Sequence, residues 1–199
     1  MQRMSLTDLV DVVSKSGTSK ATVVTNLKHR GEYSPQTDFY KPIREWIAEG
    51  HRTDRPRRDL AKLLATLEDS KKRANYPPVL EGYARWWGRK QLEWFEPQGG
   101  RFTHEGIEVS VNPELGLVVN GQRHLIKLYF KADPVSKTRL DVITHLMHEC
   151  LTRELDSKVV MGVLDVRRAR LITPTVPIKG LSALLRAELA YVQALWKEV

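Results

Sequence analysis

The residues of this chain that could do chemistry gather around Glu114, in a turn between two apolar runs. The turn reads Asn112-Pro113-Glu114, and Lys127 and Lys131 follow further along the chain. An ammonium group close to a carboxylate can stabilise negative charge that develops in a reaction. The same charges can instead lie on the solvated face of a sheet, and the sequence leaves both interpretations open.

Three short apolar runs must position these charges. They are residues 107–111, 115–119 and 124–130. Between the second and third runs stands Asn120-Gly121, the strongest short signal for a β-hairpin, because both central residues of that turn take a positive φ. The spacing predicts an antiparallel three-strand meander with Glu114 at one bend.

The third run alternates between two faces. Ile126, Leu128 and Phe130 share a face that is wholly apolar, and Lys127 lies on the opposite, mixed face. This pattern favours a solvent-facing side chain for Lys127.

The order of elements indicates an α+β fold, with a helical N-terminal half and a mostly antiparallel sheet covered by helices. Within a helical region over residues 1–96, the predicted helices are 5–15, 18–29, 39–49, 57–73 and 77–88, with a short strand at 92–95. Within an α+β region over residues 97–199, the meander precedes a helix at 136–154, a strand hairpin at 159–164 and 169–173, and a helix at 181–197. We expect the helix at 77–88 to pack on this second region.

Composition sets bounds on the class of protein. The 199 residues are 41% hydrophobic and 28% charged, which is typical of a globular protein of one large domain or two small ones. The single cysteine, Cys150, excludes a disulfide framework within the chain and favours a reducing, cytoplasmic location. No apolar run approaches the roughly 18 residues of a membrane span, so we expect no membrane partner.

The net charge of +8 comes from 32 basic and 24 acidic residues. Such an excess is compatible with a polyanionic partner, DNA or RNA. In the alternative interpretation the protein binds no nucleic acid, and the charge only maintains solubility. The sequence leaves the oligomeric state open.

Over about residues 77–199 the predicted order is helix, meander, helix, strand hairpin and helix, with Glu114 at a bend and Lys127 in Leu125-Ile126-Lys127. This arrangement resembles the core of the PD-(D/E)XK nuclease superfamily. The resemblance implies that Glu114, with Glu81 on the preceding helix, holds a divalent metal such as Mg²⁺ that activates water. It also implies that Lys127 stabilises charge on the phosphodiester.

The chain departs from the superfamily at position 125, where the second acid belongs and leucine stands. One carboxylate rarely binds a divalent ion tightly. The resemblance therefore implies either a degenerate core that does not cleave, or an active nuclease whose missing acid comes from Glu81, Glu108 or Asp165.

A second motif lies in residues 11–27, where Gly17 marks a turn and Ser19-Lys20-Ala21-Thr22-Val23 opens a helix. It resembles the helix-turn-helix of lac-repressor-type regulators, which would extend over about residues 5–30. The resemblance implies that the second helix enters the major groove of DNA. The residues that would contact bases or phosphates are Ser19, Lys20, Thr22, Lys28 and Arg30. The alternative is a helical hairpin whose polar residues are caps and surface groups.

A basic linker carries Arg57 and Arg58, which could bind phosphates without regard to sequence. Together these features favour a nucleic-acid-binding accessory protein with a nuclease-like, catalytically impaired core. One alternative is an active metal-dependent endonuclease. The other is a structural or protein-interaction subunit without nucleic-acid contact.

Overall fold

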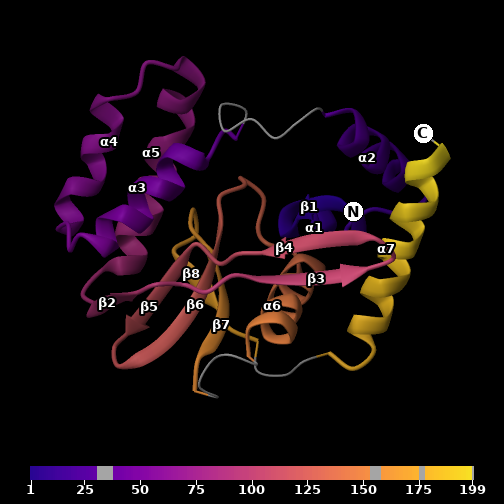
Figure 1. The fold of residues 1–199 in the computed structure, drawn as a ribbon. Helices are drawn as coiled ribbons and strands as arrows, with labels where there is room; N and C mark the ends of the chain where they lie inside the picture. Colours follow the sequence, from indigo (N-terminus) through magenta and orange to yellow (C-terminus); the bar gives the residue numbers. More distant parts are fainter. Residues whose placement is uncertain (31–37, 153–157, 175–177, 199) are drawn as a thin grey trace.

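The computed structural model describes residues 1–30, 38–152, 158–174 and 178–198, and it has the α+β fold that the sequence predicts (Figure 1). The helices are α1 (Leu6–Val13), α2 (Gly17–His29), α3 (Lys41–Arg52), the 3-10 helix η1 (Arg57–Ala61), α4 (Lys62–Ala65), α5 (Ser70–Trp87), α6 (Lys137–Leu151) and α7 (Leu181–Glu198). The strands are β1 (Gln2–Ser5), β2 (Leu92–Phe95), β3 (Gly100–His104), β4 (Ile107–Val111), β5 (Leu115–Val119), β6 (Gln122–Tyr129), β7 (Val160–Asp165) and β8 (Arg170–Ile172). No helix among these residues is long and apolar enough to cross a membrane.

The strands form two sheets. The larger has the order β2-β5-β6-β7-β8, and the smaller has the order β1-β4-β3. The β5–β6 hairpin turns at Asn120 and Gly121, whose φ angles of 49° and 88° confirm the predicted turn. Strand β7 runs parallel to β6, because α6 carries the chain back across the sheet between them. Strands from both sides of residue 97 share each sheet, since β1 pairs with β4 and β2 with β5.

The predicted meander is wrong in its first strand. The strand beside β5 is β2, whereas β4 pairs with β1 and β3 in the smaller sheet. None of residues 112–114, all of which the structure describes, takes the positive φ that a tight hairpin turn uses. The chain therefore does not reverse onto itself at Glu114, and the two sheets diverge there.

The predicted helix at 57–73 is broken, and the next helix begins earlier than residue 77. Helix α4 ends at Ala65, and Asp69 then caps α5 by accepting the Lys72 N–H at 2.9 Å. Pro77 and Pro78 consequently lie inside α5 and not at its start. The predicted end of the helix at 136–154 lies outside the described residues, since α6 is described to Leu151.

Helices cover both faces of the larger sheet. One core contains Ile126 and Leu128 of β6 and Phe130, the residue that follows β6. They pack there against α3, α4 and α5, on one side of the molecule in Figure 1. Leu125 and Tyr129 face the other way, into a core formed with α1, α6, α7 and the smaller sheet. The alternation predicted for this strand is therefore confirmed.

Candidate functional site

Glu114 and Lys127 meet at the start of β5 and the end of β6. One carboxylate oxygen of Glu114 lies 2.5 Å from Lys127 Nζ, and the other accepts the Leu128 N–H at 2.8 Å. The Lys127 ammonium group also donates to the Asn112 carbonyl oxygen at 2.8 Å. The two side chains are only 12 and 14% exposed. Lys127 is thus held against Glu114, and the expectation that it faces solvent is wrong.

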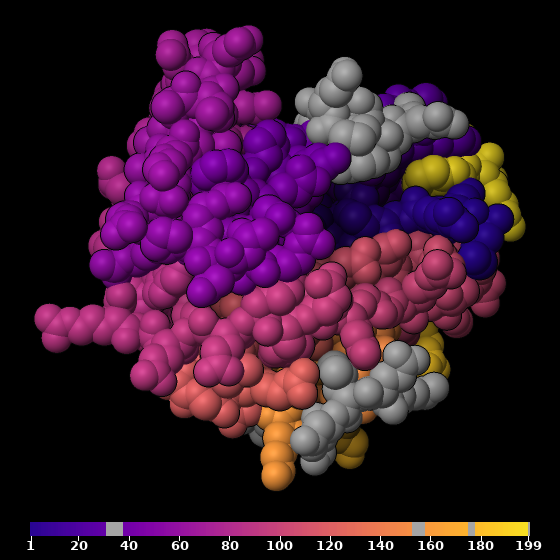
Figure 2. Space-filling view, turned by 60° about the vertical axis from the view of Figure 1, so that its left-hand side comes forward, coloured from indigo at the N-terminus to yellow at the C-terminus, as the bar shows by residue number. Residues whose placement is uncertain are grey.

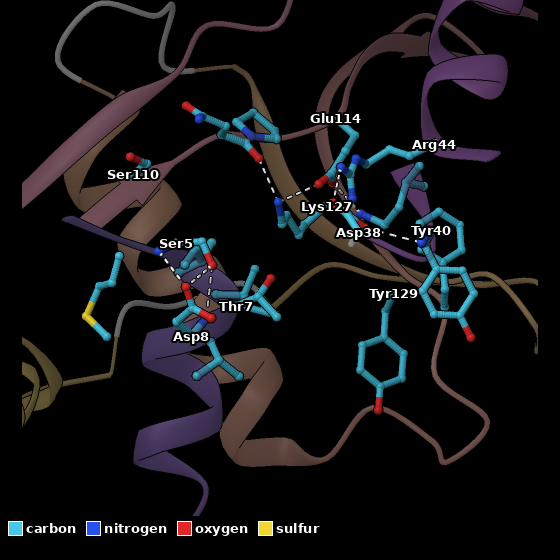
Figure 3. Close-up of a pocket in the computed structure, with 18 of the residues that line it drawn as sticks. Ser5, Thr7, Asp8, Asp38, Tyr40, Arg44, Ser110, Glu114, Lys127 and Tyr129 are labelled. Atoms are coloured by element: carbon cyan, nitrogen blue, oxygen red, sulfur yellow. Dashed lines mark hydrogen bonds and ion pairs between the residues drawn. The ribbon is translucent and has the colours of Figure 1, made fainter. Parts of the chain in front are cut away.

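This pair lies in the wall of a cavity of about 790 Å³ (Figure 3). The walls come from β1 and α1, from the start of α3, from the ends of β4 and β6, and from α6. Figure 2 shows the indigo N-terminal segment set back between the purple helical region and the pink strands. The cavity therefore occupies the place where the two sheets diverge.

The cavity is lined by more basic than acidic side chains. The rim cations, whose side chains are between 45 and 75% exposed, are Arg3, Arg30 and Lys131. The inner cations, whose side chains are between 14 and 27% exposed, are Arg44, Lys127 and Arg139. The acidic residues that line the cavity are Asp8, Asp38 and Glu114.

Carboxylates hold these cations in place. Arg30 binds Asp8 through two nitrogens, at 2.8 and 3.1 Å. Burial by itself raises the pKa of Asp8, but the hydrogen bonds from Arg30 and Ser5 outweigh burial, and its pKa falls below the ordinary value. Asp11 of α1 binds Arg139 at 2.6 Å and Lys131 at 3.1 Å. These ion pairs connect α1 to the end of α2, to α6 and to the segment that follows β6.

The residues around Glu114 do not suit a divalent metal ion. Over the described ranges, no three His, Cys, Asp or Glu side chains gather where they could hold one. Of the other acids in the cavity, Asp8 is bound to Arg30 and Asp38 to Arg44, at 2.7 Å. Mg²⁺ needs converging oxygen ligands, and the carboxylates around Glu114 do not supply them.

The other acids that the sequence suggested lie elsewhere. Glu81 is exposed on α5 and does not line the cavity. Glu108 is buried on β4 between Arg3 and Arg101, each at 3.4 Å. Asp165 is buried at the end of β7 and accepts the Val135 N–H at 3.3 Å. The structure brings Glu114 and Lys127 together and does not bring Glu81 to them.

The candidate DNA-contacting residues of α2 divide into two groups. Ser19 and Thr22 are exposed. Lys20 binds Glu188 of α7 at 2.6 and 2.8 Å, and Lys28 donates to the Trp196 carbonyl oxygen at 2.8 Å. Helix α7 therefore lies along the face of α2 that carries the two lysines, as Figure 1 shows at the right of the molecule.

The two arginines of the basic linker lie outside the cavity. Arg57 and Arg58 belong to η1 and are exposed, and Arg57 donates to the Gly88 carbonyl oxygen. Sequence reasoning missed three cations that do line the cavity, Arg3, Arg44 and Arg139. No local signal marks them, because segments far apart in the chain bring them together.

No protein-family model matches this chain, and no curated protein matches it significantly. The functional assignment therefore depends on the cavity and its side chains.

Proposed function

We propose that this protein binds nucleic acid as an accessory protein and that its nuclease-like core does not cleave. The observation that carries the proposal is the cavity at the divergence of the two sheets, where five further basic and two further acidic side chains surround the pair of Glu114 and Lys127. Lysine and arginine side chains bind the phosphates of a nucleic acid whatever its base sequence. A cytoplasmic location, which the single cysteine favours, is part of the proposal.

The topology supports the nuclease-like part of the proposal. Helix α5 precedes an antiparallel unit of β2, β5 and β6, into which β3 and β4 are inserted. Helix α6 and the parallel strand β7 follow. Apart from this insertion, and with β2 in place of the predicted first strand, this is the order that the resemblance to the PD-(D/E)XK superfamily implies, with Glu114 just before β5 and Lys127 beside it on β6.

Two observations argue against cleavage. Leu125, where the superfamily has its second acid, is fully buried in the core. Both oxygens of Glu114 already accept protein hydrogen bonds. A carboxylate in this state is a poor ligand for Mg²⁺, which takes oxygen ligands in a near-ideal octahedron.

The binding half of the proposal is tested by fluorescence anisotropy with labelled DNA and RNA oligonucleotides over a range of salt concentrations. We expect the affinity to fall steeply as salt rises, and the log–log slope to shrink by about 1 when Arg3→Gln removes one phosphate contact. Arg58→Gln, an exposed arginine outside the cavity, is the matched control and should change the slope less. Binding that ignores salt, or no binding in dilute buffer, would leave the protein-interaction alternative.

The claim that the core does not cleave is tested by incubating DNA and RNA with the protein and Mg²⁺ or Mn²⁺. We expect no cleavage above a no-enzyme control. Cleavage that Glu114→Gln and Lys127→Met abolish would instead establish an active metal-dependent endonuclease.

A further inference from the structure

The cavity has the dimensions of a small-ligand site. Its volume of about 790 Å³ lies within the range of about 300–1,000 Å³ typical of such sites. A DNA duplex carries its phosphates on the outside of a helix whose major groove alone is about 12 Å wide. A base in a duplex is stacked and paired inside the helix, so it can enter a cavity of this size only if it is unpaired and flipped out, which costs free energy.

The walls are tied together, so the cavity cannot widen freely. Asp11 on α1 binds Arg139 of α6 and Lys131, which follows β6. On the other side, β1 is hydrogen-bonded to β4 along its whole length, from Gln2 to Ser5. Opening the cavity to admit a duplex would break the ion pairs of Asp11 or the pairing of β1.

Arg139, one of the inner cations, has more donors than its carboxylate partner can accept. A guanidinium group carries five N–H donors, and Asp11, which lies 2.6 Å from one terminal nitrogen of Arg139, also binds Lys131. Ser110 and Asn112 line the same cavity, and their side chains carry neutral donors and acceptors of the kind that base edges require. Figure 3 shows Ser110 and Thr7 on the walls around the bound pair of Glu114 and Lys127.

We infer that the cavity accepts an unpaired nucleotide of a single strand, with its phosphate on the inner cations, and excludes base-paired nucleic acid. This inference rests on the proposed nucleic-acid binding and deepens it by naming the form of the polymer. The rim cations then contact the neighbouring phosphates of the same strand.

The test measures the affinity for three labelled probes of one sequence at one salt concentration: a single strand, a blunt duplex, and a duplex with a single-stranded overhang. We expect the single strand and the overhang to bind at least about tenfold more tightly than the blunt duplex. Stacking of one base on an aromatic side chain raises affinity by about fivefold to more than about a hundredfold, and Tyr40 and Tyr129 line the cavity.

Thr7→Glu tests whether the preference arises in the cavity. Thr7 is exposed, lines the cavity and lies in the first turn of α1, where an acidic residue is favourable for the helix. The variant should therefore fold, repel phosphate from the cavity and lower single-strand affinity about tenfold, with much less effect on the blunt duplex. Arg139→Gln should reduce the preference in the same way, and a circular-dichroism melt checks its folding.

The outcomes separate the two proposals. If all three probes bind equally and Thr7→Glu weakens them alike, the unpaired-nucleotide inference is wrong and the proposed function stands. If no probe binds even in dilute buffer, the proposed function itself fails.

Discussion

At the scale of single residues, the pair of Glu114 and Lys127 is as much a structural contact as a candidate site. Both side chains are mostly buried, and Glu114 accepts a backbone N–H as well as the ammonium group. Removing one partner leaves the other charge buried and uncompensated, which is more destabilising than removing both.

We therefore expect Lys127→Met to lower the free energy of unfolding by about 3 kcal/mol. The double variant Glu114→Gln/Lys127→Met should be less destabilised than the sum of the two single variants. Urea unfolding of the four proteins in a double-mutant cycle measures the coupling. A coupling energy near zero would contradict the contact.

A second residue-scale prediction concerns His51, which is buried and lies with Nε2 2.7 Å from the Tyr83 hydroxyl. Burial lowers the pKa of His51 from 6.5 to about 4, so the folded state keeps the ring neutral where the unfolded state protonates it. Stability should consequently fall as pH drops from 6.5 towards 4, by about 3 kcal/mol in total from this group.

Urea unfolding at a series of pH values checks this expectation. His51→Gln should flatten the pH dependence in this window, and the matched variant of an exposed histidine, His29→Gln, should not. An unchanged slope in His51→Gln would mean that another group titrates.

At the scale of elements, α5 is docked closely on the turn between β7 and β8. A Cβ added at Gly82 would lie 2.1 Å from the Val166 carbonyl oxygen, which no side chain tolerates. Arg85 of the same helix donates to the Arg167 carbonyl oxygen at 3.0 Å. The helix and the turn therefore meet backbone to backbone.

We expect Gly82→Ala to lower the free energy of unfolding by about 3 kcal/mol or more, because the helix must move away from the sheet. Gly50→Ala in α3 is the control, since its Cβ would meet only Arg55, at 3.9 Å. That variant should gain up to about 1 kcal/mol from the higher helix propensity of alanine. Thermal unfolding of both variants measures the contrast, and equal effects would contradict the close docking.

At the scale of the whole molecule, two surfaces are candidates for binding nucleic acid: the cavity and helix α2. The cavity gathers cations from β1, α2, α3, β6 and α6, whereas α7 engages Lys20 and Lys28 of α2. The helix-turn-helix stays a prediction, and of its candidate residues Ser19 and Thr22 are exposed.

Thr22→Glu distinguishes the two surfaces, because Thr22 is exposed and its hydroxyl makes only a local bond to Thr18. If the cavity is the contact, oligonucleotide affinity measured by anisotropy should change less than twofold. A large loss of affinity for duplex DNA alone would favour the helix-turn-helix instead.

The sequence by itself determined the features that depend on neighbours in the chain. Asn120-Gly121 forms the predicted turn, and Ser5 caps α1 in a capping box with Asp8. The alternation of Leu125 to Phe130 is as predicted, although the face that the sequence suggested was solvated contributes Leu125 and Tyr129 to a second core. Each of these depends on backbone preference or side-chain period over a few residues.

Only the tertiary structure decided how the sheets and the cavity are assembled. The short strands β1 and β3 have little apolar pattern of their own and form by pairing with β4. Three segments far apart in the chain supply Arg3, Arg44 and Arg139. In the sequence, a single arginine with no neighbouring motif predicts only a surface residue. Contacts between residues far apart in the chain leave no local periodicity or spacing, so only the folded molecule could bring these cations to Glu114 and Lys127.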